Sequence, residues 1–156
     1  MDNLSTEAKV TSLTMIQGIV NRFSDKTSKL KGIYITVMSA LLTVAITYIL
    51  PKQTAETPYI YLILMSLVFL IICLCFLSLD RTFLYYGRIM RKIYDCKAND
   101  RRANGKKIKN YYKITPEFHY IKKRKLVSNR LSMTQVLFYI VPLFIFEVAI
   151  WVIGVK

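Results

Sequence analysis

The residues with the clearest potential for binding chemistry are cations interleaved with aromatic rings in one polar segment, residues 80–131. Cations neutralise phosphates while aromatic rings stack on bases, which is how many proteins bind single-stranded nucleic acid. The predicted ligand is therefore an anionic oligonucleotide or a cyclic nucleotide. The residues predicted to bind its phosphates and bases are Arg88, Arg91, Lys92, Arg101, Arg102, Lys106, Lys107, Lys109, Tyr111, Tyr112, Lys113, His119, Lys122, Lys123 and Arg124.

Two simpler interpretations account for the same segment. Basic side chains next to a membrane attract anionic lipid headgroups, by about 1 kcal/mol per residue near the surface. Aromatic rings also anchor chains at headgroup level, or they pack together as a small core. The sequence alone does not decide between these interpretations and a nucleotide-binding site.

A second set of candidate residues lies in apolar parts of the chain. Glu147 is the only formally charged side chain within the three longest apolar stretches. Such a group costs about 2.5 to 3.5 kcal/mol in a bilayer and usually faces a bundle interior or an aqueous cavity. Thr36, Thr43 and Thr47 share one helical face, which is typical of close helix packing or of a narrow water-filled path. These four residues are predicted to line a pore or form a subunit contact.

Glu147 also has less specialised explanations. One is that it lies close enough to the outer boundary to reach water. Alternatively, it stays protonated against a hydroxyl such as that of Thr43 or Thr47.

The sequence gives little support for a catalytic function. The single histidine, His119, has no second ligand at zinc spacing, and the three cysteines form no CxxC motif. There is no glycine-rich phosphate loop and no nucleophile elbow. The prediction is a protein that is not an enzyme, with no catalytic residue, no metal and no cofactor.

The elements that position these residues are three apolar stretches, 33–50, 59–79 and 133–155. Each has about the twenty residues that a helix needs to cross a hydrocarbon core roughly 30 Å thick. Because hydrocarbon offers no hydrogen bonds to the backbone, each stretch must be helical. The predicted fold class is all-α, an integral membrane protein with three transmembrane helices that spans and contacts the lipid bilayer.

Charge placement predicts the orientation. Residues 1–32 carry five Lys and Arg and residues 80–131 carry sixteen, whereas 51–58 and the tail carry one each. Basic segments stay on the cytoplasmic side. The predicted location is therefore the cell inner membrane, multi-pass, with the N-terminus in the cytoplasm and the C-terminus outside.

Periodicity predicts the remaining elements. Residues 5–24 have the three-and-four spacing of an amphipathic helix, and one helix is expected to run from residue 59 to about 97. A turn is expected at 98–105, followed by a short helix that begins near Thr115 and Pro116, although the alternation at 107–114 is partly strand-like. Ser132 is a plausible cap for the third span. The predicted segments are 1–32 (amphipathic N-terminal helix), 33–79 (transmembrane hairpin), 80–131 (basic cytosolic segment) and 132–156 (third transmembrane helix).

Several short runs resemble a known group of proteins: MIQGIVNR at 15–22, LKG at 30–32, LD at 79–80 and RKIYD at 91–95. They are similar to small bacterial membrane effectors of the SLATT type, found in antiphage-defence islands such as Hailong systems. The resemblance covers roughly residues 13–97, and the third span with Glu147 departs from two-span members. It implies an oligomeric channel or membrane-disrupting effector that is controlled by a nucleotide-derived ligand, with a nucleotidyltransferase encoded alongside.

The residues and the resemblance together give one functional prediction. Three spans are too few to enclose a path, so a pore requires a homo-oligomeric ring. The expected protein is a homo-oligomeric channel gated by an anionic nucleotide-derived ligand at its basic cytosolic face. The alternatives are a membrane adaptor that recruits a soluble partner through its polybasic helices, or a sensor of membrane disturbance.

Overall fold

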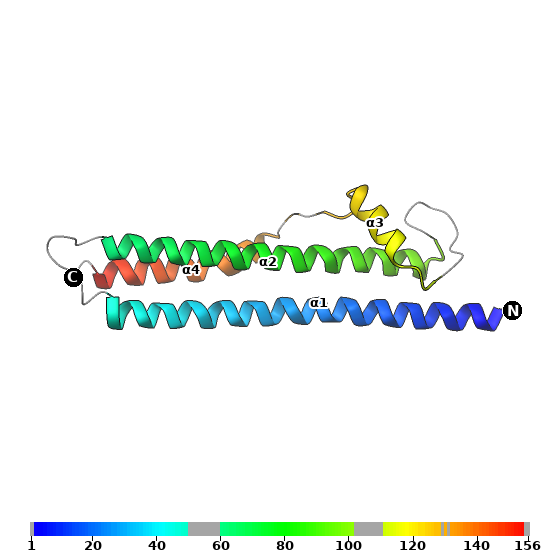
Figure 1. Ribbon diagram of the computed structural model, residues 1–156, viewed down its shortest axis with the longest axis horizontal. Helices are drawn as coiled ribbons and strands as arrows, with labels where there is room; N and C mark the ends of the chain where they lie inside the picture. Colours follow the sequence, from blue (N-terminus) through cyan, green and yellow to red (C-terminus); the bar gives the residue numbers. More distant parts are fainter. Residues whose placement is uncertain (1, 50–59, 102–110, 129, 131, 155–156) are drawn as a thin grey trace. The chain divides into compact units, whose positions relative to one another are not determined.

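The computed structural model describes residues 2–49, 60–101, 111–128, 130 and 132–154 (Figure 1). Its regular elements are the helices α1 (Asp2–Val44), α2 (Ile60–Ala98), α3 (Thr115–Lys123) and α4 (Met133–Gly154), with a π-helical turn η1 (Ala45–Ile49) directly after α1. Helices α1, α2 and α4 each contain a segment long and apolar enough to cross a membrane. The predicted all-α class with three candidate spans is confirmed.

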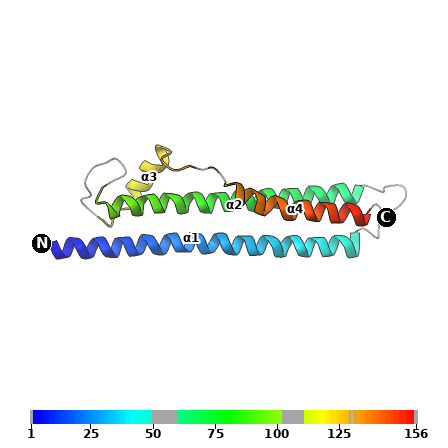
Figure 2. The same cartoon turned by 180° about the vertical axis from the view of Figure 1, so that it is seen from behind.

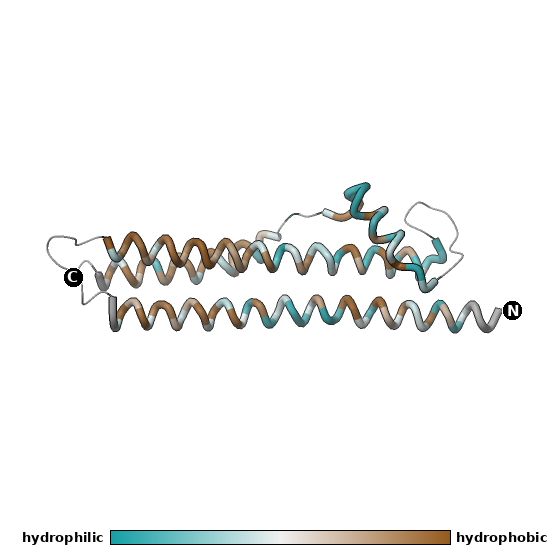
Figure 3. The backbone as a smooth tube through the Cα atoms, in the orientation of Figure 1, coloured by the Kyte–Doolittle hydropathy of each residue, from teal (hydrophilic) through white to brown (hydrophobic). Residues whose placement is uncertain are grey.

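The chain forms two compact units. The apolar unit comprises residues 28–80 and 131–156, and the basic unit comprises residues 1–27 and 81–130. Helices α1 and α2 contribute residues to both units. Figure 3 shows the corresponding change of hydropathy along α2, from apolar in its first half to mixed in its second. The two units are described separately below.

The predicted N-terminal helix and the first span are one helix. Helix α1 runs from Asp2 to Val44 and passes through position 32, where the sequence suggested a boundary. Residues 24–32 contain no proline, and Gly32 by itself costs a helix only about 1 kcal/mol. Nothing in this stretch therefore ends the helix.

Helix α2 matches the single helix predicted from residue 59 to about 97. It ends in a Schellman turn, in which the Asp100 amide donates to the Lys97 carbonyl (3.1 Å) and the Arg101 amide donates to the Cys96 carbonyl (2.9 Å). Asp100 has the left-handed φ of 56° that this turn requires. The predicted turn after residue 97 is confirmed at 99–100, and residues 102–110 lie outside the described part of the chain.

Helix α4 begins as predicted. The Gln135 amide donates to Ser132 Oγ (3.3 Å), and the Ser132 amide donates to Gln135 Oε1 (2.9 Å). This reciprocal pair is a capping box, which satisfies amides at a helix start that otherwise lack partners. Pro142 lies within the helix and cannot donate to the carbonyl four residues earlier.

The core of the apolar unit joins all three of its helices. Tyr34 of α1, Phe69 and Leu62 of α2, and Tyr139 of α4 are fully buried there. The Tyr34 hydroxyl donates to the Tyr139 backbone carbonyl (2.9 Å), and their rings meet edge to face at 4.8 Å. Cys73 Sγ donates weakly to the same carbonyl (3.6 Å). Figures 1 and 2 show α4 alongside the first half of α2.

Many apolar side chains of this unit point outward. Ile63 and Leu67 of α2 and Phe144, Ile145 and Val152 of α4 are more than half exposed. A surface of this kind would be unstable in water and suits contact with lipid. It agrees with the assignment of these helices as membrane spans.

The hydrogen bond from Tyr34 provides a test of this core. Tyr34→Phe removes the donor to the Tyr139 carbonyl without changing the ring, and should destabilise the folded protein by about 1 kcal/mol. The thermal midpoint of the helical circular dichroism signal, measured in detergent, reports the effect. Tyr61→Phe is the matched control, because Tyr61 is exposed. Equal midpoints for both variants would contradict a structural role for the Tyr34 hydroxyl.

Candidate functional site

The basic unit is organised around a small cluster of branched apolar side chains. Ile16 of α1, Ile89 and Ile93 of α2, and Ile121 of α3 are fully or almost fully buried against one another. The ring of Phe118 stacks on that of Tyr86 with centroids 5.9 Å apart. This packing holds α3 against the second half of α2 (Figure 1), and it confirms the predicted short helix at Thr115.

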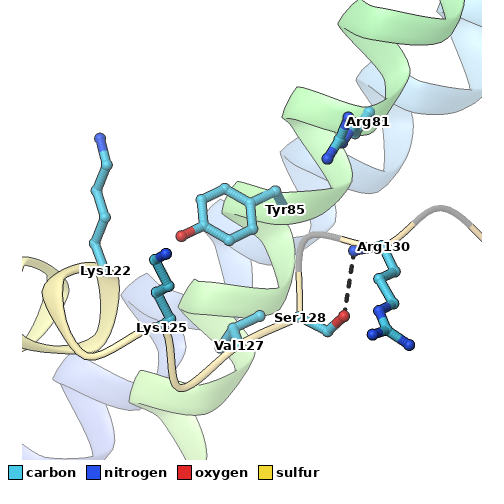
Figure 4. A pocket seen from close by; sticks show the side chains of 7 residues that line it. All are labelled: Arg81, Tyr85, Lys122, Lys125, Val127, Ser128 and Arg130. Carbon is cyan, nitrogen blue, oxygen red and sulfur yellow. Dashed lines mark hydrogen bonds between the residues drawn. The ribbon is translucent and has the colours of Figure 1, made fainter.

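A pocket of about 770 Å³ opens beside this cluster (Figure 4). Four of its seven lining residues are cations and none of the seven is acidic. Two residues come from α2, one from α3, and four from the chain after α3. They are Arg81, Tyr85, Lys122, Lys125, Val127, Ser128 and Arg130.

The chain turns sharply into this pocket at the end of α3. The Lys125 amide donates to the Lys122 carbonyl (3.2 Å) and the Leu126 amide donates to the Ile121 carbonyl (3.2 Å). This is a second Schellman turn, and Lys125 occupies its left-handed position with φ 50°. Glycine is the usual residue there because a Cβ is strained at positive φ. The sequence instead places a lysine at this position, at the edge of the pocket.

Arg88 holds two of the lining residues, Ser128 and Arg130, in place. Its Nη1 atom donates to the carbonyls of Ser128 (3.1 Å) and Arg130 (2.8 Å). The Arg130 amide also donates to Ser128 Oγ (3.2 Å), the bond drawn in Figure 4. Residues 125–128 and 130 have no regular secondary structure. These bonds, together with the packing of Val127 on the apolar cluster, hold them on α2.

The arrangement suits a phosphate-bearing ligand. Arg81 and Arg130 carry planar guanidinium groups that bind phosphate oxygens in pairs, and the two lysines add point charges. A concave wall lined by one sign of charge focuses the field on its opening and attracts anions. The volume falls within the 300 to 1,000 Å³ that is typical of small-ligand sites. Tyr85 projects toward Lys122 and Lys125 in Figure 4, where it can offer a ring or a hydroxyl.

The predicted binding residues are only partly gathered here. Lys122 lines the pocket and Arg88 positions its wall. Lys123 and Arg124 are exposed at the adjoining end of α3. Arg91, Lys92, Arg101, Tyr112, Lys113 and His119 are exposed but do not line the pocket. The predictions for Arg102, Lys106, Lys107 and Lys109 fall outside the described residues.

Most residues of the pocket were not among the predicted binding residues. Arg81, Lys125 and Arg130 all belong to the basic segment 80–131, but none of them is in the predicted site. One signal was present: Arg81, Tyr85 and Arg88 recur at three- and four-residue spacing along α2, which places them on one face. The turn that brings Lys125 and Arg130 to that face is not marked by a glycine, so the sequence did not indicate it.

Tyr111 takes part in a different, structural network. Its hydroxyl donates to Asp100 Oδ1 (2.5 Å), which is also paired with Lys9 Nζ (2.8 Å). Its backbone carbonyl accepts from Ser12 Oγ (2.7 Å) and from Lys97 Nζ. The hydrogen bond to Asp100 raises the pKa of the Tyr111 phenol. Tyr111 therefore ties the start of α1 to the end of α2.

Lys97 is the buried cation of this network. Its side chain is about 1% exposed, and Nζ also donates to Ser12 Oγ (2.9 Å). Burial lowers the pKa of Lys97, and the nearby Glu117 carboxylate partly opposes that shift.

The candidate pore residues have defined partners in the apolar unit. Thr36 and Thr43 are exposed, and their hydroxyls donate to carbonyls of their own helix, at Gly32 and Ser39 (both 3.0 Å). Thr47 is exposed within η1. Glu147 accepts a hydrogen bond of 2.5 Å from Ser66 Oγ of α2. The hydroxyl that meets this carboxyl group is thus that of Ser66, rather than that of Thr43 or Thr47 as the sequence suggested.

The fold and the pocket together define a class: a helical protein with three helices suited to spanning a membrane and a separate unit that carries a basic pocket. Comparisons with protein-family models, curated proteins and solved structures found no match to this chain. Among the described residues, no group of three or more His, Cys, Asp and Glu side chains could hold a metal ion.

Lys97 gives the basic unit a predictable dependence on pH. Because the folded protein releases the Lys97 proton at a lower pH than the unfolded chain does, the unfolding free energy contributed by this residue should rise as pH approaches the ordinary lysine value of 10.5. Thermal melts from neutral pH upward should show that rise in the wild type and not in Lys97→Met. Lys92→Met, at an exposed position of α2, should keep it. Parallel pH profiles for the wild type and Lys97→Met would contradict the assignment.

Proposed function

We propose that this protein is a homo-oligomeric membrane channel or effector, gated by an anionic nucleotide-derived ligand at its basic cytosolic face and acting in bacterial antiphage defence. The observation that carries this proposal is the pocket lined by Arg81, Lys122, Lys125 and Arg130 around Tyr85. The resemblance to SLATT-type effectors supplies the expected setting, including the inner membrane and a nucleotidyltransferase encoded alongside.

The pocket favours a compact ligand. Its volume of about 770 Å³ suits one or two nucleotides, whereas a longer oligonucleotide would extend over neighbouring surface. Four cations match a ligand with several phosphate charges. Tyr85 is the residue placed to stack on a base or to donate to a phosphate oxygen. The ligand class is therefore a mononucleotide, a cyclic nucleotide or the end of a short oligonucleotide.

Gating follows from where the lining residues lie in the chain. Arg81 directly follows the apolar part of α2, and Arg130 lies two residues before Ser132, which caps α4. A phosphate group held by both arginines would restrain the chain at the end of the apolar part of α2 and just before the start of α4. Such a ligand opens or closes the channel only if it binds one conformation of these two chain segments more tightly than the other.

The pore is proposed to form between subunits. The exposed hydroxyl face of α1, with Thr36, Thr43 and Thr47, is suited to close helix contact or to lining water. Glu147 is half-buried in one subunit, and a ring of such carboxyl groups would favour cations.

A second function is supported by the run of exposed cations from Lys122 to Lys125. These side chains would also bind anionic lipid headgroups, as expected for a membrane adaptor or a sensor of membrane disturbance. Nucleotide and lipid share phosphate chemistry, so the tests must separate the two sources.

The binding test uses the full-length protein in detergent with ATP, a cyclic dinucleotide and a short oligoadenylate as probes, and adenosine as the phosphate-free control. Arg81→Ala should weaken binding of a phosphate-bearing probe about tenfold, the effect of losing one charged hydrogen bond. Lys125→Gly should weaken binding while leaving the fold intact, because glycine suits φ 50°. Affinity should fall with salt.

Arg91→Ala is the matched control for this test. It removes the same charge from an exposed position of the same helix that does not line the pocket. Equal weakening by Arg81→Ala and Arg91→Ala would show diffuse electrostatic attraction and would overturn the pocket assignment. Competition by anionic lipid vesicles with no response to any nucleotide would favour the adaptor.

Ion flux tests the channel itself. Liposomes that contain the protein should release potassium in a manner that depends on the nucleotide bound best, and Arg81→Ala should shift the concentration dependence. Binding without flux, with and without nucleotide, would refute the channel and leave the adaptor.

A further inference from the structure

The basic unit has another hollow, on the exposed side of α1. It has a volume of about 300 Å³ and is lined by Met15, Gly18, Ile19 and Arg22. Because a helix turns by about 100° per residue, Gly18 lies nearly opposite Ile16, which is buried in the apolar cluster of this unit. The α1 hollow therefore lies on the face of the helix that the cluster leaves uncovered.

The four lining residues have the spacing of a helix-packing site. Positions 15, 18, 19 and 22 follow the i, i+3, i+4, i+7 pattern of the hole that receives one side chain from a facing helix in knobs-into-holes packing. Gly18 keeps this hole open, because a Cβ there would meet no side chain of a non-adjacent residue within 4 Å. Met15, at its edge, is 55% exposed. The hollow thus suits an apolar side chain from another helix.

The distribution of charge indicates which helix fits. Residues 1–27 carry three cations and three acidic residues, whereas the rest of the basic unit, 81–130, carries sixteen Lys and Arg against three acidic residues. An acidic protein or an anionic lipid surface would be attracted to 81–130 rather than to the balanced segment of α1. A second copy of this chain has the opposite requirement. Its own 81–130 repels that of its neighbour, so two copies approach with least repulsion along α1.

Two side chains at the hollow complement each other between copies. Arg22 lines the hollow, Asp25 lies about one turn further along α1, and both are exposed. Within the described part of the chain neither of them makes an ion pair. Copies that span one membrane in the same orientation place their α1 helices parallel and at equal height. Arg22 of one copy is then about 4.5 Å along the axis from Asp25 of the other, within reach of an arginine side chain, and Ile19 is at the level of the hollow.

We infer that residues 15–25 of α1 form a contact between copies of this chain, in which Ile19 of one copy enters the α1 hollow of the next and Arg22 pairs with Asp25. The inference rests on the homo-oligomer of the proposed function and names a surface through which its basic units meet. It depends on neither the nucleotide nor ion flux.

Energy transfer between donor- and acceptor-labelled copies of the full-length protein in lipid vesicles measures this contact. Gly18→Leu fills the hollow without meeting non-adjacent side chains of its own chain, and should weaken association about tenfold or more, because an overfilled packing site rejects the incoming side chain. Unchanged energy transfer in Gly18→Leu would overturn the inference and leave the hollow to lipid or to a different protein.

Gln17→Leu is the matched control. It adds a leucine at a neighbouring exposed position that does not line the hollow. Its association should stay within about twofold of the wild type, as is usual for surface substitutions. Equal weakening by Gln17→Leu and Gly18→Leu would show a general effect of an added leucine and would overturn the assignment of the hollow.

Charge reversal tests the pairing between copies. Arg22→Asp and Asp25→Arg should each weaken self-association, because like charges then face each other, whereas an equimolar mixture of the two variants should restore it. Each variant keeps its own like charges along its helix in the mixture, so the restoration can arise only between copies. A mixture that associates no better than the single variants would overturn the pairing.

These outcomes are distinct from those of the channel proposal. Association that Gly18→Leu leaves unchanged refutes this contact alone. Association that Gly18→Leu weakens, in vesicles that show no ion flux, supports the contact and refutes the channel. Wild-type copies that do not associate would overturn both the contact and the homo-oligomer.

Discussion

The constraint on which the structure depends is that hydrocarbon offers no hydrogen bonds. Every polar group in the spans must find its partner within the protein. The backbone does so by forming helices, and several side chains do so as well: Tyr34 donates to a carbonyl of α4, Thr36 and Thr43 of α1 donate to their own helix, and Ser66 meets Glu147. The spans are thus linked by a few polar contacts within a largely apolar packing.

The basic unit is subject to a different constraint. It holds four cations together at one pocket, and these like charges repel one another. Repulsion between exposed like charges amounts to roughly 1 kcal/mol or less per pair. The four buried isoleucines of the cluster beside the pocket each contribute about 1.5 to 3 kcal/mol by leaving water. Their burial offsets repulsion between the exposed cations, and the unit keeps an electrostatic field that an anion can relieve.

The sequence predicted most of the fold because its strongest signals are local. The lengths of the apolar stretches, the spacing along α2 and the Ser132 cap each depend on neighbours in the chain, and the structure confirms all three. The pocket and the Ser66 contact were missed because they depend on distant residues. Arg88 meets carbonyls about forty positions away, and Ser66 meets a carboxyl group 81 positions away. No periodic pattern records such pairings.

The threonine and serine hydroxyls on the outer face of α1 have a consequence for assembly. Since Thr36, Ser39 and Thr43 already donate to carbonyls of their own helix, a neighbouring molecule that touches this face displaces lipid without breaking a polar contact. Its departure strands no donor either. Lateral contacts made there would depend mainly on close packing, because each hydroxyl has already used its one proton and keeps only the capacity to accept.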